Sequence, residues 1–270
     1  MSSIAVENLA FAYDSEVVLK DINLRIESGD FACLLGESGC GKSTFLRLMA
    51  GLAMPTAGVI KVDGKPVNGA GLDRGVVFQD YSLFPWLTNG YNLLLALRQK
   101  YKDKSKKELK EMALRGLEEV GLDASVFHKF PFELSGGMRQ RCAICRAFTL
   151  DPPVLLMDEP FGALDAITRA RLQRTILHLW RKNAVERKTI VFVTHDVDEA
   201  LLLANKIFLF GSSPSGIIYQ HFFKEGEKPP ADELLDSPHI IQLRNRLIQA
   251  LNKDIATKVE HDTSAMLHRA

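Results

Sequence analysis

No hydrophobic segment of this 270-residue sequence is long enough to cross a bilayer as a helix, which takes about 18 or more apolar residues. The apolar stretch at residues 200–210 is interrupted by Asn205 and Lys206. The N-terminus has neither a basic region nor a continuous apolar stretch behind it, so we expect no secretory signal. A chain that itself spans a membrane is therefore not expected.

The net charge is also small, and cysteines are few. The formal net charge is only +1, which removes the general electrostatic argument for a nucleic-acid-binding protein. Cysteine occurs four times, without the spacing of a disulfide framework, which fits a reducing compartment. Cys142 and Cys145 form a C-x-x-C pattern inside a predicted helix that no strand precedes, so we interpret them as small, half-buried side chains.

The composition that remains is that of a globular protein. Hydrophobic residues make up 46% of the chain and charged residues 25%. The length is sufficient to bury a sizeable core and suits one large domain or two closely joined lobes.

The clearest motif is GESGCGKST at residues 36–44, which matches the phosphate-binding pattern G-x-x-x-x-G-K-[ST] without a mismatch. An apolar run at residues 31–35 predicts a buried strand before it, and Phe45, Leu48 and Met49 predict a helix after it. The glycines let backbone N–H groups wrap a phosphate, and the helix N-terminus adds partial positive charge. The alternative, a glycine-rich turn without a ligand, is disfavoured by the Lys-Ser-Thr ending and by both flanks.

Individual residues of this loop have expected tasks. Lys42 is expected to reach the β- and γ-phosphates, and the Ser43 hydroxyl to contact Mg²⁺. Cys40 lies beside Lys42 and the helix N-terminus, a setting that predicts a lowered thiol pKa and a reactive thiolate. The predicted nucleotide contacts in this segment are Gly36, Glu37, Ser38, Gly39, Cys40, Gly41, Lys42, Ser43 and Thr44.

Three further apolar strands are each followed by polar side chains. Residues 76–78 lead to Gln79, residues 154–157 to Asp158 and Glu159, and residues 189–194 to His195. The carboxyl ends of parallel strands meet at one edge of an open sheet, where ligands bind. We therefore expect these polar groups to converge with Lys42.

These groups would divide a hydrolytic reaction among them. Asp158 is expected to hold Mg²⁺, and Glu159, which points elsewhere, to polarise a water molecule. His195 is expected to contact the γ-phosphate, and Gln79 to touch both the metal and the water. We predict hydrolysis rather than kinase chemistry because no separate acceptor site is evident.

The remaining segments surround this core. Alternating apolar and polar residues at 1–30 and 59–62 predict antiparallel strands, with Tyr13 in a loop between two of them. Helical spacing of apolar residues at 91–101, 106–120 and 138–148 predicts a helical lobe inserted in the α/β core. Near the C-terminus, Ser237 is expected to cap a final helix.

A second anion site is predicted at residues 134–138, LSGGM, where another helix begins. Ser135 offers a hydroxyl, Gly136 and Gly137 offer N–H groups, and the helix end adds positive charge. One chain with two such half-sites in separate lobes predicts a head-to-tail dimer, in which each phosphate loop meets Ser135 and Gly137 of the other copy.

These motifs together resemble the nucleotide-binding subunits of ABC transporters, over about residues 4–223. The matching segments, in the family's order and spacing, are the phosphate loop, VVFQ ending at Gln79, LSGGMRQR, VLLMDEP, GALD ending at Asp165, and VTHD with His195. The resemblance implies ATP and Mg²⁺ as ligands and Tyr13 as the aromatic residue that stacks on adenine. It also implies that Gln140 and Asp165 belong to the nucleotide site.

The resemblance also implies the architecture. The expected fold class is α/β, a P-loop NTPase core with a mostly parallel sheet, an antiparallel β subdomain and an inserted helical subdomain. The expected domains are an ABC ATPase domain at 1–223, with the helical subdomain at about 88–150, and a C-terminal helical tail at 224–270.

A narrower resemblance is to ATPases of nitrate, sulfonate and taurine importers. It is carried by Phe78, Gln79, Leu83, Pro85, Trp86, Leu87, Thr88, Asn92 and the segment DEPFGALDA. The sequence departs from that pattern at residues 88–91, TNGY, where the family usually has an aliphatic residue and then often an acidic one.

The implied function is to energise uptake of a small solute, an anion such as sulfonate, taurine or nitrate, or another solute such as a vitamin precursor. The implied partners are membrane permease subunits, a second ATPase subunit that forms a homodimer or a heterodimer with this one, with the homodimer favoured, and, indirectly, an extracytoplasmic solute-binding protein. The implied location is peripheral, on the cytoplasmic face of the inner membrane.

Two other functional classes stay open. A soluble ABC ATPase acting on nucleic acid or ribosomes is disfavoured by the single cassette, by the lack of a coiled-coil insertion and by the lack of basic bias, so no nucleic-acid partner is expected. A non-hydrolysing nucleotide sensor is disfavoured because Glu159 and His195 are both present.

Overall fold

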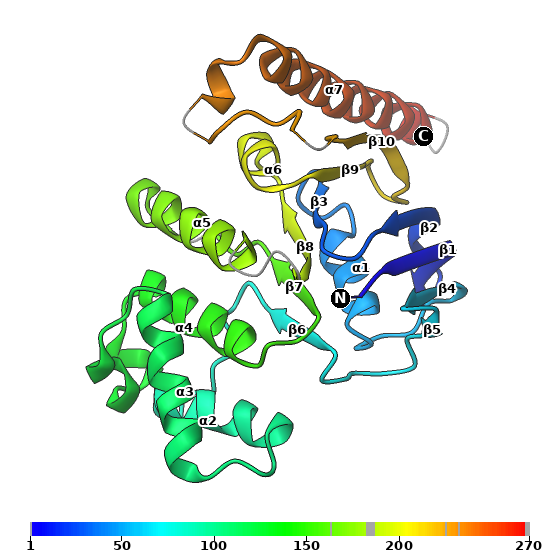
Figure 1. Ribbon diagram of the computed structural model, residues 1–270. Coiled ribbons are helices and arrows are strands. Elements are labelled where there is room, and N and C mark those ends of the chain that lie inside the picture. Colours follow the sequence, from blue (N-terminus) through cyan, green and yellow to red (C-terminus); the bar gives the residue numbers. More distant parts are fainter. Residues whose placement is uncertain (1, 163, 182–186, 225, 232, 268–270) are drawn as a thin grey trace. The chain divides into compact units, whose positions relative to one another are not determined.

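The computed structural model describes residues 2–162, 164–181, 187–224, 226–231 and 233–267 (Figure 1). The chain divides into two compact units. Residues 70–190 form one, called here the helical unit, and residues 2–69 together with residues from 191 onward form the other, called the P-loop unit.

The P-loop unit contains an antiparallel sheet in the order β2-β1-β4-β5. Its strands are β1 (Ile4–Tyr13), β2 (Glu16–Ile26), β4 (Ala57–Val62) and β5 (Lys65–Pro66). The predicted alternation is confirmed in β1, where Ile4, Val6 and Leu9 are buried. Asp63 and Gly64 join β4 to β5 with φ angles of 50° and 75°, as a tight hairpin turn requires.

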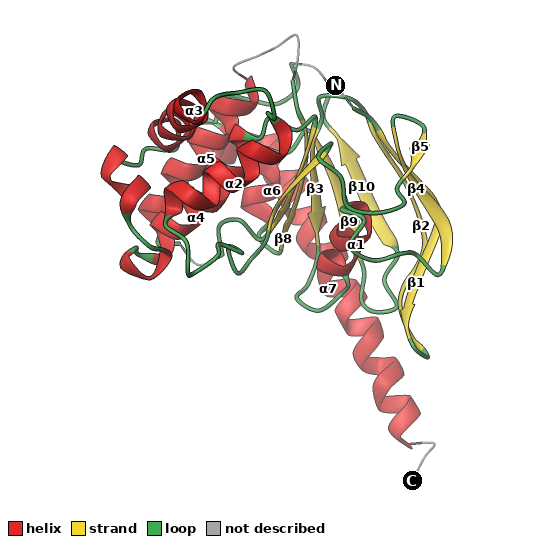
Figure 2. Cartoon of the chain, turned by 90° about the horizontal axis from the view of Figure 1, so that it is seen from below, coloured by secondary structure: helices red, strands yellow, loops and turns green. Residues whose placement is uncertain are grey.

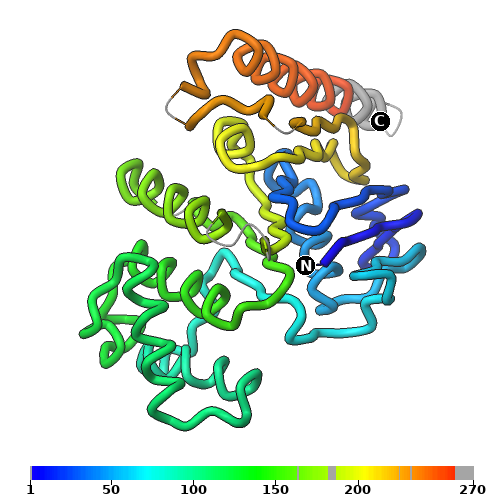
Figure 3. The backbone as a smooth tube through the Cα atoms, in the orientation of Figure 1, coloured from blue at the N-terminus to red at the C-terminus, as the bar shows by residue number. Residues whose placement is uncertain are grey.

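The same unit contains strands of a second sheet, in which β10, β9, β3 and β8 are neighbours in that order, although the first two residues of β8 are counted with the helical unit. The bounds are β3 (Phe31–Leu35), β8 (Thr189–Thr194), β9 (Lys206–Phe210) and β10 (Ile217–Phe222). Strand β3 runs parallel to β9, and β10 pairs with β9 in the antiparallel sense. Figure 3 shows β3, in blue, beside the yellow β9 that follows it much later in the chain. Every residue of β3 and β8 is buried, as in strands covered on both faces.

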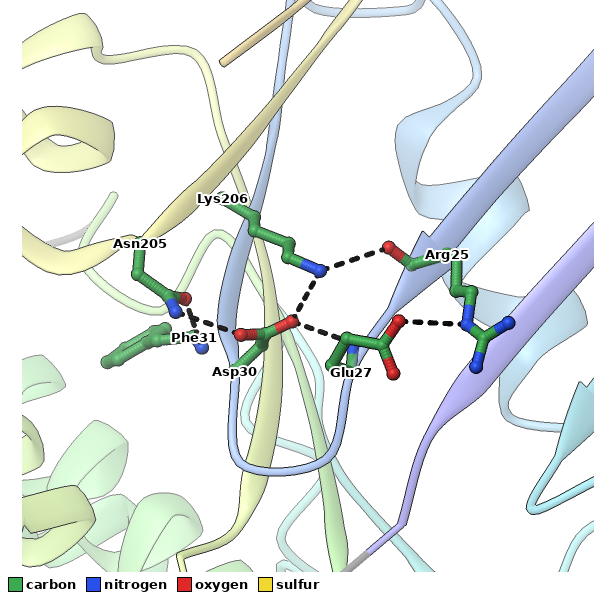
Figure 4. A network of polar contacts seen from close by, with 6 residues as sticks. All are labelled: Arg25, Glu27, Asp30, Phe31, Asn205 and Lys206. Carbon is green, nitrogen blue, oxygen red and sulfur yellow. Dashed lines mark hydrogen bonds and ion pairs between the residues drawn. The ribbon is translucent and has the colours of Figure 1, made fainter. Parts of the chain in front are cut away.

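A polar network fixes the start of β3 to the start of β9 (Figure 4). The Asn205 side chain accepts a hydrogen bond from the Phe31 backbone N–H at 2.7 Å and donates to Asp30 at 2.9 Å. Asp30 also forms an ion pair with Lys206 at 2.8 Å and accepts from the Glu27 backbone N–H at 2.7 Å. The strand that leads into the phosphate loop is thus anchored both by its backbone pairing and by side-chain contacts.

Three helices complete the described P-loop unit: α1 (Lys42–Met49), α6 (Val197–Leu203) and α7 (Pro238–Leu267), with a short 3₁₀ turn at Leu234–Asp236. Ile240, Leu243 and Leu247 form the buried stripe of α7. Figures 1 and 2 show α7 lying against α6 and β10 and extending beyond them. Arg244 on α7 donates two hydrogen bonds to Asp198 on α6, at 2.6 and 3.1 Å.

The described residues of the helical unit include one parallel strand pair and four helices. The strands are β6 (Arg74–Val77) and β7 (Val154–Asp158). The helices are α2 (Asn89–Lys100), α3 (Lys106–Glu119), α4 (Gly136–Thr149) and α5 (Ala166–Arg181), with 3₁₀ turns at Ala124–His128 and Pro131–Glu133. The helices predicted from apolar spacing are thereby confirmed. None of the helices in the described part of the chain combines the length and hydrophobicity that crossing a bilayer requires.

The unusual residues at the start of α2 have structural roles. Thr88 caps the helix, its hydroxyl accepting a hydrogen bond from the Tyr91 backbone N–H. Buried Asn89 donates to the Lys129 carbonyl at 2.7 Å. A Cβ at Gly90 would lie 2.5 Å from the ring of Phe127, so only glycine fits there. Local packing therefore accounts for the departure of residues 88–90 from the importer pattern.

Candidate functional site

The phosphate loop leaves β3 and enters α1 as its sequence predicts. Gly41 precedes the helix with φ 99°, a left-handed conformation that favours glycine, and no side chain caps the helix start. Lys42 is 4% exposed, and its Nζ donates to the carbonyls of Gly36, at 2.8 Å, and Glu37, at 2.5 Å. A backbone loop wrapped around an ammonium group, next to an uncapped helix N-terminus, fits a polyphosphate.

The prediction for the Cys40 thiol is wrong in its direction. Cys40 is buried, and burial raises its pKa more than the nearby Lys42 lowers it. The Lys42 Nζ lies 3.7 Å from the Cys40 Sγ, but the same ammonium group also donates hydrogen bonds to two backbone carbonyls. Cys40 is therefore a packed side chain of the loop rather than an activated nucleophile.

The other cysteine prediction is confirmed more strongly than expected. Cys142 and Cys145 are fully buried in α4, and burial raises the pKa of each thiol to about 12. They are free thiols that pack as small apolar groups.

His195 and the phosphate loop share a cavity of about 470 Å³. The loop contributes Gly36, Glu37 and Ser38, and His195 stands at the end of β8. The next residue, Asp196, caps α6 by accepting hydrogen bonds from the backbone N–H groups of residues 198 and 199. Within the P-loop unit, two of the predicted elements of the ATP site are thus brought together.

The sequence analysis missed a third contributor to this cavity, helix α7. Leu251, Asn252 and Ile255 line it. Asp254, between them, accepts a hydrogen bond from the Ser212 backbone N–H at 2.6 Å and so ties this part of α7 to the β9–β10 turn. The spacing of Leu247, Leu251 and Ile255 continues the buried stripe, and this was the available signal for the contact.

Tyr13, the proposed adenine-stacking residue, is the last residue of β1 rather than a loop residue. Its side chain is 49% exposed, and its ring meets Phe11 edge to face, with 4.7 Å between centroids. The ring therefore has support from Phe11, while a large part of the residue stays open to a ligand.

In the helical unit, Gln79 and Glu159 lie side by side. The Gln79 Nε2 donates a hydrogen bond to the Glu159 Oε2 at 3.2 Å. Asp158, the last residue of β7, is 6% exposed, whereas Gln79 is exposed. Glu159 has φ 43°, a left-handed backbone that is uncommon for a residue with a side chain.

The loop after Gln79 is held by α4. Tyr81 and Ser82 both have positive φ angles, 66° and 44°. Half-buried Arg146 on α4 donates to the Ser82 carbonyl at 2.7 Å and to the Tyr81 carbonyl at 3.4 Å. Burial lowers the pKa of Arg146, although its guanidinium stays ionised because arginine loses its proton only far above neutrality. Sequence reasoning did not single out Arg146, since one arginine in a helix carries no motif.

The second predicted anion site begins α4. Ser135 caps the helix by accepting a hydrogen bond from the Met138 N–H, and Gly136 and Gly137 follow as its first residues. A Cβ at Gly137 would lie 3.2 Å from the Thr168 methyl group, which shows how closely α5 approaches this turn. The predicted helix start is thus present, and the binding of an anion there stays a prediction.

Two residues implied by the family resemblance have internal roles. Gln140 is buried, and its Nε2 donates to the Pro160 carbonyl at 2.7 Å. Asp165 starts α5 by accepting from the backbone N–H groups of Ile167 and Thr168, at 3.1 and 3.0 Å. These hydrogen bonds, and most of all the one from the Thr168 backbone N–H, lower the pKa of the Asp165 carboxyl group.

The predicted residues therefore fall into two sets. Lys42, Ser43, His195 and Tyr13 belong to the P-loop unit, and Gln79, Asp158, Glu159, Gln140, Asp165 and the Ser135 turn belong to the helical unit. Convergence of the two sets stays a prediction. Among the described residues no three His, Cys, Asp or Glu side chains gather as a metal site, and the predicted set of Ser43, Gln79 and Asp158 contains one carboxylate.

Residues 19–162 match the family described as ABC transporter. The chain is 41% identical to the nitrate import ATP-binding protein NrtD of Synechococcus elongatus, over 89% of this chain and 86% of that protein. It is 40% identical to the bicarbonate transport ATP-binding protein CmpD of Synechocystis sp., over 92% and 88%. Among solved structures, the ATP-binding cassette MJ0796, a dimer bound to ADP and Pi, superposes with a TM-score of 0.74 at 31% identity, over 82% of this chain and 99% of that one.

Proposed function

The chain belongs to the ABC transporter family, and from this membership we propose that it is the ATP-hydrolysing subunit of an importer for a small anion. It is an ATPase with the α/β P-loop fold that its sequence predicts. The observation that carries the proposal is the pair of anion-binding backbones: the loop around Lys42 and the turn capped by Ser135.

We assign the hydrolytic chemistry to Glu159, Gln79 and His195. Glu159 would take a proton from the attacking water. Gln79, whose side-chain amide donates a hydrogen bond to the Glu159 carboxylate, would orient that water. His195, exposed at the rim of the phosphate-loop cavity, would donate to the γ-phosphate. The left-handed backbone at Glu159 supports this assignment because such strain gathers at catalytic positions.

Magnesium would be held by Ser43, Gln79 and Asp158. When bound with the nucleotide, Mg²⁺ neutralises the charge that develops on the phosphate oxygens. A set of one hydroxyl, one amide and one carboxylate suits this ion, which keeps several water molecules and takes few protein ligands.

We further propose a head-to-tail dimer of two identical chains. ATP held by Tyr13 and residues 36–44 of one copy would be covered by Ser135, Gly136 and Gly137 of the other, with Gln140 and Asp165 supporting those turns. The dimeric cassette with ADP and Pi supports this arrangement. Within each chain, we assign residues 1–223 to the ABC ATPase domain, with a helical subdomain at about 88–150, and residues 224–270 to a C-terminal tail.

The nitrate and bicarbonate ATP-binding relatives support a small inorganic anion as the transported solute, with a sulfonate or taurine as the organic equivalent. A vitamin precursor is the alternative solute. Permease subunits would receive this ATPase at the cytoplasmic face of the inner membrane, and a solute-binding protein would act from the other side.

Co-purification and uptake test this proposal together. The tagged chain, expressed with its own permease, should be recovered from membranes with that permease, and vesicles should take up nitrate or bicarbonate when supplied with MgATP and the binding protein. Lys42→Ala should still co-purify but support no uptake, because the buried ammonium group at the centre of the phosphate loop is lost. Recovery with ribosomes or nucleic acid would favour the soluble ABC ATPase instead, and uptake of only a neutral or cationic solute would contradict the anion assignment.

A further inference from the structure

The helical unit contains a second cavity, of about 370 Å³, that no residue assigned to ATP lines. It lies where helices α4 and α5 meet the end of α3, three neighbours in Figures 1 and 2. Three arginines, Arg141, Arg171 and Arg174, line it together with the hydroxyl-bearing Thr168 and Thr175.

The charged side chains that line this cavity all carry positive charge. Helix α4 contains three arginines and α5 contains four, and neither helix contains an aspartate or a glutamate. No carboxylate lines the cavity, although Glu118 and Glu119 precede it in the chain. In a protein with a net charge of +1, this is a local concentration of positive charge, and a concave surface focuses such a field.

The guanidinium groups are available to a ligand. Arg171 and Arg174 are exposed, and within the described ranges neither side chain forms a hydrogen bond or an ion pair. Arg141 donates only to backbone carbonyls, those of Gly121 at 2.8 Å and Gly137 at 3.4 Å, which do not neutralise its charge. Arginine forks suit the planar and tetrahedral oxyanions of carboxylates and phosphates.

We propose that this cavity binds a small oxyanion as an effector of the ATPase. The volume lies within the range of small-molecule sites, about 300–1,000 Å³, and exceeds that of a lone phosphate. Leu172 and Val120 give the cavity an apolar part that a carbon skeleton can cover. The shared chemistry is a phosphate or sulfate group, supplied either by an inorganic anion or by a phosphorylated metabolite.

The effect on hydrolysis follows from Arg141 and rests on the proposed function. The Nε of Arg141 bonds to the Gly137 carbonyl, in the turn assigned to the other copy's ATP. Thr168, which lines the cavity, packs against that same glycine. An anion that draws the Arg141 side chain toward Arg171 weakens this hold on the turn, so the bound ligand lowers ATP turnover.

Chemical modification tests binding without any need for ATPase activity. Phenylglyoxal labelling, mapped by peptide mass spectrometry, would be run at constant ionic strength with 10 mM sulfate, 3-phosphoglycerate or neutral glycerol. A ligand with a Kd of about 1 mM should slow labelling of Arg171 and Arg174 about tenfold, while exposed Arg98 on α2 is unaffected. Protection by 3-phosphoglycerate alone identifies a metabolite site, and equal protection by sulfate an inorganic one.

Protection by neither anion, equal protection by neutral glycerol, or equal protection of Arg98 would overturn the proposal. For the coupling, the better anion should lower turnover at saturating MgATP about fivefold. The doubly substituted Arg171→Ala/Arg174→Ala chain should keep its basal activity and lose this inhibition. A Lys106→Ala/Lys107→Ala chain, which loses the same charge from the exposed start of α3, should keep it. Inhibition that persists without Arg171 and Arg174 would refute the coupling, whereas a chain without any ATPase activity would contradict only the proposed function.

Discussion

The Glu159 side chain combines three features that a general base needs. It follows a fully buried strand, its backbone is held in the left-handed region, and its carboxylate is bonded to the Gln79 amide. Each feature limits the positions that the carboxylate can reach, and a fixed base loses little freedom when a water molecule must be aligned.

Replacing Glu159 by glutamine should therefore remove the base while keeping its shape. We expect ATP turnover to fall on the order of 10²-fold or more, with nucleotide affinity unchanged and the dimer trapped in its ATP-bound form. Phosphate release and size-exclusion chromatography with ATP measure the two effects. Glu118→Gln, an exposed change on α3, is the matched control, and hydrolysis at the control's rate would remove Glu159 from the mechanism.

Sequence motifs predicted the local structure around some single residues. The loop around Lys42 and the placement of Glu159 beside Gln79 follow from short sequence patterns, whereas the cap that Ser135 forms on α4 was not predicted. Cys40 was misjudged because a pattern gives its neighbours in sequence but not its burial, and desolvation opposes the thiolate more strongly than one lysine favours it.

Among the strands, β3 is held at its start by Asp30, which is 8% exposed and bonds to Lys206, Asn205 and the Glu27 backbone. Asp30→Ala leaves the Lys206 charge and the Asn205 amide without this partner. We expect the free energy of unfolding to fall by about 2–4 kcal/mol, somewhat below the cost of breaking a fully buried pair.

Urea titration followed by circular dichroism measures this loss. Glu7→Ala breaks the exposed pair between Glu7 and Lys61 in the antiparallel sheet and should cost less than about 1 kcal/mol. Equal effects of the two substitutions would show that the network at β3 adds nothing beyond an ordinary surface ion pair.

The sequence predicted most elements but not how they are capped or what they cover. Apolar spacing located α2, α3 and α4 to within a few residues. It could not predict that Gly90 makes room for Phe127, because that contact joins residues 37 apart and depends on packing. The reach of α7 to the phosphate-loop cavity was missed for the same reason.

The helical unit displays an exposed aromatic pair in a firmly held loop. Phe84 is 39% and Trp86 70% exposed, with ring centroids 5.3 Å apart. Asn92 accepts from the Phe84 N–H at 2.8 Å and donates to the Phe84 carbonyl at 3.1 Å, which fixes the loop to α2. Rigid exposed aromatic side chains are typical anchors of protein interfaces.

Trp86→Ala should therefore uncouple transport from hydrolysis. Loss of such an anchor costs about 2 kcal/mol or more of binding, which corresponds to a fall in uptake of at least about thirtyfold at limiting subunit, while the isolated chain hydrolyses ATP at its normal rate. Phe132→Ala, which removes another exposed aromatic ring (71%) of the same unit, is the control. Uptake by the Trp86 variant at the control's level would place the permease contact elsewhere.

The family and its ATP chemistry could be predicted over about residues 4–223 because the family's motifs occur there in fixed order. The transported solute could not be derived from residue chemistry, since no residue assigned here is expected to touch it. The arginine-lined cavity was also missed: its side chains come from α4, α5 and the end of α3, and only folding brings them together.

The division of the chain into two units has a consequence for how the protein is made. Residues 70–190 are continuous, whereas the P-loop unit is assembled from both ends, and Phe31 bonds to a residue 174 positions later. At about 5–20 residues per second, a ribosome adds β9 roughly 10–35 s after β3. The helical unit can fold during that interval, while the phosphate loop waits for its neighbouring strands. A nascent chain therefore completes its ATP-binding loop late in synthesis, after the segment that contains β9 and α7 has left the ribosome.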